Sequence, residues 1–245
     1  MNLRIAAAAW AVALALPGLA TTILTDQHVD IGIGYDTVGS AWDMHVHNET
    51  DNEEYEPGDV LLQLTSSAIR QRPNSSNFDF IGVGAGQNYW RIFSSPTSGI
   101  LYLGIGTEET GDVFESYTES DSRITQLGGN LTGEWVTLRV KSFTGPGQVS
   151  LWSNTDNGPL VWFATSDGIG ANDYVLVPDN SHQHFEWGFS QAGRYDITFE
   201  ASGIINGQRA FSGDVVYSFE AVPEPMTMTL LGLGLAAVAA RRRRK

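Results

Sequence analysis

The chain has 245 residues, no cysteine and a formal net charge of −14 at pH 7. An acidic balance of this size argues against nucleic acid as a partner, because phosphates are bound by clusters of lysine and arginine. The absence of cysteine excludes disulfides, thiolate metal sites and cysteine nucleophiles, so an apolar core must hold the fold.

Residues 1–20 have the features of a secretory signal peptide. Arg4 precedes an apolar run at residues 5–16, and small residues lead up to Ala20. This pattern predicts export of the chain and cleavage by signal peptidase after Ala20.

Residues 21–221 are predicted to form one β-domain. Short runs alternate apolar and polar residues, and Gly, Asn, Asp and Pro separate them. The runs cover residues 28–35, 41–47, 60–64, 78–83, 100–105, 135–140, 148–152, 161–164, 185–189, 195–199 and 214–221. Period-two alternation indicates half-buried strands. We therefore expect an all-β fold, an antiparallel β-sandwich of immunoglobulin-like or jelly-roll-like type, with a closed barrel as the alternative.

The stretch at residues 181–203 carries the clearest strand signals. Phe185, Trp187 and Phe189 alternate with polar residues, the chain turns at Gly193, and a second alternating run begins at Tyr195. The order Gly-x-Tyr-x-Ile-x-Phe is typical of a tyrosine corner, in which the phenol hydroxyl bonds to nearby backbone. We therefore expect two half-buried strands joined at a glycine turn.

All five histidines fall into three short phrases, which are His28 with Asp30, His45 with His47, and His182 with His184. Residues i and i+2 of a strand share a face and lie about 6.6–6.8 Å apart, so both imidazoles of a pair can reach one ion. If the two His-x-His strands are neighbours, the pairs would together bind Zn or another divalent transition metal, with His28 close by. The alternative is that these are outward polar positions of edge strands.

Other chemistry has weaker support. There is no Gly-x-Ser-x-Gly and no His-Glu-x-x-His motif, so a hydrolase is the least favoured hypothesis and we expect no enzymatic activity. Binding to exopolysaccharide is the alternative function, through stacking of sugar rings on aromatic side chains. The candidates are Trp42, Trp90, Trp152, Trp162 and Trp187, although their alternating positions favour a place in the core.

Several phrases of the body resemble one known family. They include HVDIGIGY at 28–35, WDMHVHNE at 42–49, LYLGIGTE at 101–108, and His182-x-His184 ahead of Trp187 and Tyr195. Together they are similar to the choice-of-anchor M family of surface-anchored proteins, over residues 25–203. The resemblance implies an exported, surface-displayed β-domain without established catalysis. Glu186 departs from the family's usual asparagine, which either adds a carboxylate ligand or has no role.

Residues 222–245 resemble a PEP-CTERM sorting signal. Pro223, Glu224 and Pro225 precede an apolar segment at 226–240 and a basic end at 241–245. The apolar segment is short for a transmembrane helix, which needs roughly 20 residues, and its basic flank would stay in the cytoplasm. The resemblance implies transient anchoring in the inner membrane, cleavage by an exosortase near Pro-Glu-Pro, and release to the envelope, cell surface or extracellular matrix. A permanent single-span anchor is the alternative.

Overall fold

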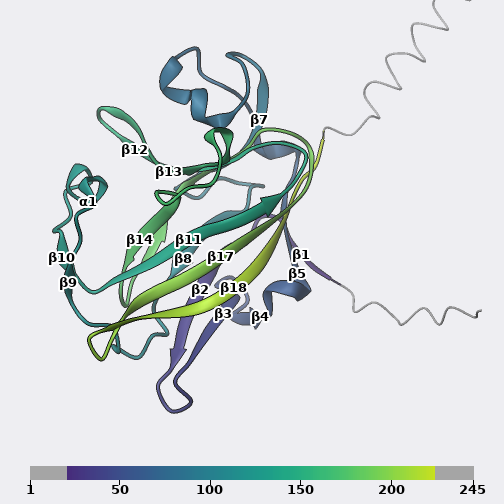
Figure 1. The fold of residues 1–245 in the computed structure, drawn as a ribbon. Helices are drawn as coiled ribbons and strands as arrows, with labels where there is room; N and C mark the ends of the chain where they lie inside the picture. The colour runs from purple at the N-terminus through teal and green to yellow at the C-terminus, as the bar shows by residue number, and fades with distance from the viewer. Residues whose placement is uncertain (1–20, 224–245) are drawn as a thin grey trace, which may run out of the picture.

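The computed structural model describes residues 21–223, and these residues form an all-β fold, as expected. The predicted signal peptide at 1–20 and the predicted transmembrane helix at 226–240 lie outside the described residues. Within residues 21–223 the few helices are too short to span a membrane. Three larger sheets and one small ribbon make up the fold (Figure 1).

Each of the three larger sheets combines strands that are distant in the sequence. In spatial order, sheet A consists of β1 (Thr22–Leu24), β5 (Val60–Leu64), β18 (Gln208–Ala221), β17 (Gly193–Ile205), β11 (Trp135–Thr144) and β14 (Tyr174–Pro178). Sheet B consists of β15 (His182–His184), β8 (Tyr102–Gly106), β2 (His28–Asp36), β3 (Ala41–Asn48) and β4 (Glu53–Tyr55). Sheet C consists of β13 (Gly158–Ala164), β12 (Val149–Thr155), β16 (Glu186–Phe189), β7 (Asn88–Ile92) and β6 (Ile69–Gln71).

Not every strand pair is antiparallel, which corrects the expectation of a purely antiparallel fold. The pairs β1–β5, β5–β18 and β2–β8 are parallel. Each of these pairs joins strands far apart in the sequence, so no tight hairpin fixes their relative direction. The alternation of apolar residues predicted the strands but carries no information about such long-range pairings.

The alternation at 78–83 predicts a strand, and this prediction is wrong. Most of the run belongs to the 3-10 helix η3 (Ser76–Ile81). The Ser75 hydroxyl accepts a hydrogen bond from the Asn77 N–H, and Arg72 Nε donates to the Phe78 carbonyl at 2.9 Å. These local bonds outweigh the alternation of the phenylalanines. The other short helices are η1 (Pro57–Asp59), η2 (Ser66–Ala68), η4 (Thr165–Asp167) and α1 (Ser122–Gln126).

The stretch at 181–203 crosses all three sheets. It contributes β15 to sheet B, β16 to sheet C and β17 to sheet A. The chain changes sheet at Phe185, which is buried, and turns at Gly193, whose φ of 130° favours glycine. The tyrosine corner is confirmed, because the Tyr195 hydroxyl donates to the Gln191 carbonyl at 2.7 Å and accepts from the Gln191 N–H at 3.1 Å. The histidine strand β15 is thereby followed directly by a buried residue, Phe185.

Aromatic side chains fill the space between sheets A and C. Trp187 of β16 packs against Phe219 of β18, with ring centroids 5.7 Å apart, and Phe163 of β13 packs against Phe199 of β17 at 6.2 Å. Sheet B is tied to sheet A by Tyr217, whose buried hydroxyl donates to the backbone carbonyl of His45 at 3.1 Å. The apolar side chains of sheet B therefore face the interior, and its other face is left for polar residues.

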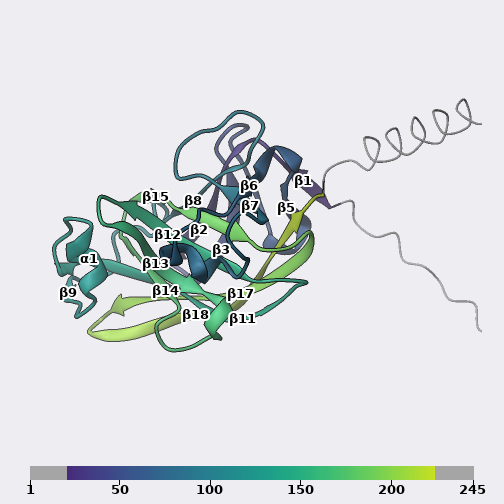
Figure 2. The ribbon, with the colours of Figure 1, turned by 90° about the horizontal axis from the view of Figure 1, so that it is seen from above.

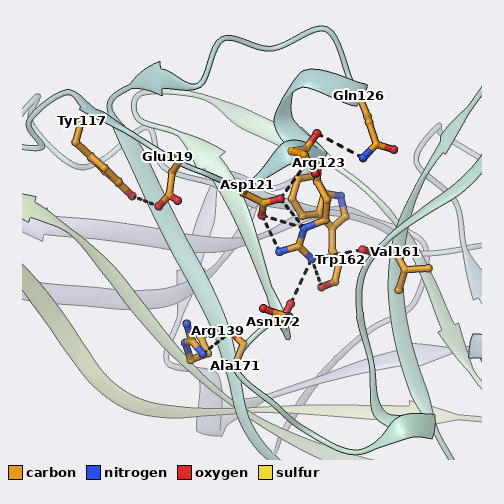
Figure 3. Close-up of polar contacts among 11 residues, drawn as sticks. Tyr117, Glu119, Asp121, Arg123, Gln126, Arg139, Val161, Trp162, Ala171 and Asn172 are labelled. Atoms are coloured by element: carbon orange, nitrogen blue, oxygen red, sulfur yellow. Dashed lines mark hydrogen bonds and ion pairs between the residues drawn. The ribbon is translucent and has the colours of Figure 1, made fainter.

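The segment from β9 (Tyr117–Thr118) through α1 to β10 (Thr132–Gly133) projects to one side of the body (Figures 1 and 2). Arg123 fastens it to the body, as Figure 3 shows. Its guanidinium bonds the Asp121 carboxylate at 2.8 Å and donates to the Trp162 carbonyl at 2.6 Å. The same group lies over the Tyr174 ring, 4.6 Å from its centroid. These contacts make a charged anchor for the segment rather than a free binding group.

Candidate metal centre

All five histidines belong to sheet B, and strand register places most of them in two rows across it. One row runs through His182, Gly106, Gly32 and His45. The next row runs through His184, Gly104, Asp30 and His47, and His28 lies one further row along β2. The two histidine pairs therefore occupy the outer strands of four, and glycines and Asp30 lie between them.

Three imidazoles converge at the first group of residues. The Nε2 atom of His184 lies 2.8 Å from Nε2 of His182 and 3.1 Å from Nε2 of His28. A carboxylate oxygen of Asp30 lies 4.0 Å from Nε2 of His28. One ligand atom from each of these four residues lies within 4.8 Å of the other three. We call His28, Asp30, His182 and His184 the inner cluster.

Hydrogen bonding alone does not account for the inner cluster. A neutral imidazole nitrogen carries either one hydrogen or one lone pair, so Nε2 of His184 cannot form good bonds to two other Nε2 atoms. A Zn–N bond of 2.0–2.1 Å in tetrahedral geometry places two ligand nitrogens roughly 3.3 Å apart. The distances of 2.8 and 3.1 Å are close to that value. The residues therefore fit a divalent transition metal with three nitrogen ligands and one oxygen ligand.

Burial adjusts the charges of the inner cluster. Asp30 is 2 % exposed, and one of its carboxylate oxygens has no hydrogen-bond partner among the described residues. Burial raises the pKa of Asp30 to about 6, and burial followed by the charge of His182 lowers the pKa of His184 to about 4. The His184 ring is therefore neutral at pH 7, which is the form that binds metals, while Asp30 is a buried anion that no lysine or arginine within residues 21–223 pairs with.

Neighbouring side chains contact two of the imidazoles. The ring of Tyr102 stacks on that of His184, with centroids 3.6 Å apart and planes inclined by 6°. A carboxylate oxygen of Glu108 lies 3.8 Å from Nδ1 of His182, on the side of the ring away from the cluster. At this distance the carboxylate and the ring interact through charge and not through a hydrogen bond, and the negative charge favours electron-pair donation from the imidazole to a metal.

Glycines make the floor of the site because larger residues would displace the ligands. A Cβ atom on Gly104 would lie 2.1 Å from a carboxylate oxygen of Asp30 and 3.0 Å from His184. A Cβ atom on Gly32 would lie 2.2 Å from Nε2 of His45. Gly32 in β2 and Gly104 in β8 thus provide the room that the polar side chains occupy.

A second group forms beside the inner cluster. Glu109 places one carboxylate oxygen 3.8 Å from Nε2 of His45 and the other 3.7 Å from Nδ1 of His47. Glu109 is held there because its carbonyl accepts a hydrogen bond from the Tyr35 N–H at 3.0 Å, which continues the course of β8 beside β2. We call His45, His47 and Glu109 the outer cluster.

The structure does not bring the two His-x-His pairs to one point. Three strand steps separate β15 from β3, and each step is about 4.8 Å, so one ion cannot reach both pairs. The expectation of a single site with four histidine ligands is therefore corrected to two groups, one of which includes His28. Asp30 was recognised in the His-x-Asp phrase, but Glu109 was missed, because nothing in the sequence places residue 109 against β3.

Two other candidates belong to the framework of the fold. Glu186 is buried in sheet C, where its carboxylate accepts hydrogen bonds from Arg91 at 2.7 Å and Asn154 at 2.8 Å, and it belongs to neither cluster. Four of the five tryptophans considered for sugar stacking are buried, namely Trp90, Trp152, Trp162 and Trp187. Their rings fill the core, and they offer no exposed face to a sugar.

The C-terminal residues give the clearest comparison with known proteins. Residues 221–244 match the PEP-CTERM protein-sorting motif. The chain carries an exosortase sorting signal. A PEP-CTERM protein is exported and sorted to the cell surface, and exosortase processes its signal. Comparison with curated proteins and with solved structures found no significant match. The resemblance of the body to the choice-of-anchor M family stays a prediction.

Proposed function

We propose that the exported body is a non-enzymatic binding protein for a divalent transition metal, displayed outside the cell after exosortase processing. The supporting observation is the convergence of three imidazole nitrogens and one buried carboxylate in the inner cluster. Four protein ligands without an open position are typical of sites that hold a metal, whereas catalytic zinc sites keep one position free. The nitrogen and oxygen set suits zinc, copper or nickel, and zinc is the first metal to test.

The proposal extends to the route and form of the protein. Signal peptidase removes residues 1–20, the apolar segment at 226–240 holds the chain in the inner membrane, and exosortase then cuts it. The facing of sheets A and C supports describing the body as a β-sandwich, to which sheet B is added. Exopolysaccharide binding stays an alternative prediction, and the burial of the tryptophans weakens it.

Calorimetric titration with zinc tests the proposal. We expect the purified protein to bind zinc tightly, and a His182→Ala, His184→Ala variant to lose this tight binding. Gln183→Ala is the matched control, because Gln183 lies between the two histidines and has its side chain on the opposite face of β15. Equal affinity in the wild type and the double variant would show that the inner cluster is not the site.

A further inference from the structure

We infer that the outer cluster is a second, separate binding site for a divalent transition metal, so that the body takes up two ions side by side on sheet B. The inference goes beyond the proposed function, which needs only the inner cluster. Two imidazoles and one carboxylate, from His45, His47 and Glu109, offer ligand atoms within 4.8 Å of one another.

The spacing within the outer cluster leaves room for an ion. The distances of 3.8 and 3.7 Å from the Glu109 carboxylate to His45 and His47 are too long for hydrogen bonds. Ligand atoms that each lie 2.0–2.2 Å from a common ion are roughly 3.3–3.5 Å apart, so a small closure of these side chains completes the site. A cavity lies at this point, and Asp30, Gly32 and Glu108 line it together with the three ligands.

The position of the buried His45 ring also bears on this site. His45 is 5 % exposed, and its Nδ1 atom has no hydrogen-bond partner among the described residues. Its Nε2 atom lies over Gly32, where a Cβ atom would come within 2.2 Å of it. The cation would bind at Nε2, the nitrogen that faces Glu109, whereas the unpartnered Nδ1 lies on the other side of the ring.

Carboxylates around the outer cluster favour a cation over an anion. Glu49 lies 3.4 Å from Nδ1 of His47, and Asp43 lies 3.8 Å from Nδ1 of His45. Both carboxylates make the surroundings of the outer cluster negative, although neither forms a hydrogen bond to an imidazole. Asp30 of the inner cluster lies next to the outer cluster, because its strand position pairs with Gly104 on one side and with His47 on the other. Its negative charge reduces the repulsion between two neighbouring dications.

The two sites should differ in affinity. The outer cluster has three protein ligands, and the Glu109 side chain is 41 % exposed, so solvent completes the coordination there. The inner cluster has four ligands and a buried carboxylate. We therefore expect the inner cluster to fill first and the outer cluster to bind on the order of tenfold or more weakly, because it lacks one ligand and meets the charge of the first ion.

Zinc stoichiometry, measured by calorimetry and by elemental analysis of the full chain, tests the inference. We expect two ions in the wild type, and one ion in a His47→Gln, Glu109→Gln variant. Asp156→Asn is the control for loss of one negative charge, since Asp156 lies exposed in the turn between β12 and β13 of sheet C, and it should keep both ions. Glu109→Gln alone is the second variant, because an exposed side chain can be replaced without unfolding the protein.

The result also separates this inference from the proposed function. A single ion in the wild type, or two ions in the His47→Gln, Glu109→Gln variant, overturns the second site. The His182→Ala, His184→Ala variant should keep one ion at the outer cluster. If that variant kept both ions, the assignment of the inner cluster would fail, while loss of one ion from the outer-cluster variant would still support the second site.

Discussion

At the scale of single residues, two glycines of one strand should respond differently to the same substitution. A Cβ atom on Gly104 would overlap Asp30 and press on His184, whereas one on Gly106 would have its nearest neighbour at 3.6 Å, an ordinary contact. We therefore expect Gly104→Ala to lower zinc affinity by tenfold or more and Gly106→Ala to change it little. Titration of both variants with zinc tests this, and equal losses would mean that the glycine floor has no special role.

Asp30 should destabilise the metal-free protein at neutral pH. Burial raises its pKa in the folded state from 3.8 to about 6, so its contribution to stability is fully present below pH 3.8 and is lost as the pH rises through 6. A shift of this size corresponds to roughly 1–3 kcal/mol. Asp30→Asn should therefore raise the unfolding temperature of the chelator-treated protein at pH 8, with the difference vanishing near pH 4.

The prediction for Asp30 has an opposite counterpart when metal is present. The ionised carboxylate is a ligand, so saturating zinc should stabilise the wild type more than Asp30→Asn at pH 8. Thermal unfolding with and without zinc compares the two. His184 moves the other way with pH, because its folded-state pKa of about 4 lies below the ordinary 6.5, and its contribution is lost as the pH falls through 6.5 toward 4. If Asp30→Asn did not raise the unfolding temperature of the chelator-treated protein at pH 8, the destabilising role of Asp30 would be contradicted.

The sequence identified the histidines that lie on one face of sheet B, but it did not show how they divide into two clusters. The i, i+2 spacing of the histidines follows from strand geometry, and it correctly placed the two imidazoles of each pair on one face. The division into two clusters depends on the order of β15, β8, β2 and β3 in sheet B, which pairs strands far apart in the sequence. Glu109 was missed for the same reason, since only the parallel course of β8 and β2 brings it over β3.

At the scale of elements, the metal should hold down the edge of sheet B. β15 has three residues and, within the described part of the chain, pairs with β8 alone, so its hydrogen bonds are expected to open easily. Zinc in the inner cluster would connect β15 to β2 across β8. At a zinc concentration 100 times the dissociation constant, binding adds about 2.7 kcal/mol to the cost of opening, which slows amide exchange about 100-fold.

Hydrogen exchange followed by mass spectrometry measures this effect. We expect zinc to protect the amides of β15 in the wild type and not in His184→Ala. The amides of β11, which is paired on both sides within sheet A, serve as the internal reference. Protection of β15 and β11 to the same degree would indicate a global effect of zinc and would contradict local stabilisation of β15 by the metal.

The sequence predicted elements well wherever alternation and turn residues agreed. The tyrosine corner at Tyr195 is confirmed, and so are the strands around residues 185–189 and 195–199. The assignment failed at η3, where hydrogen bonds from Ser75 and Arg72 decide the local structure. β7 and β14 were not predicted. The turn at Ala192-Gly193 leads from sheet C to sheet A. The sequence could not predict this, because a glycine turn within a hairpin has the same residues as one between two sheets.

At the scale of the whole molecule, the folded body ends directly beside the sorting signal. The Val222 N–H donates to the Leu64 carbonyl at 2.8 Å, and the Val222 carbonyl accepts from Trp90 Nε1 at 2.8 Å. Val222 is thus fastened to β5 and to sheet C, and the Pro-Glu-Pro motif begins at the next residue. β1, β5 and the end of β18 lie together at one end of the body (Figures 1 and 2).

Alanine substitution of Pro223, Glu224 and Pro225 should block sorting without affecting the body. The motif is the part of the signal that exosortase is expected to recognise, so the triple variant should stay at full length in the inner membrane. Cell fractionation and immunoblotting of the host measure both properties. The His182→Ala, His184→Ala variant is the control, because sheet B and the sorting signal do not share residues, and it should be processed like the wild type. Normal processing and release of the triple variant would contradict the role of Pro-Glu-Pro, and a block in the histidine variant would mean that sorting depends on the metal site.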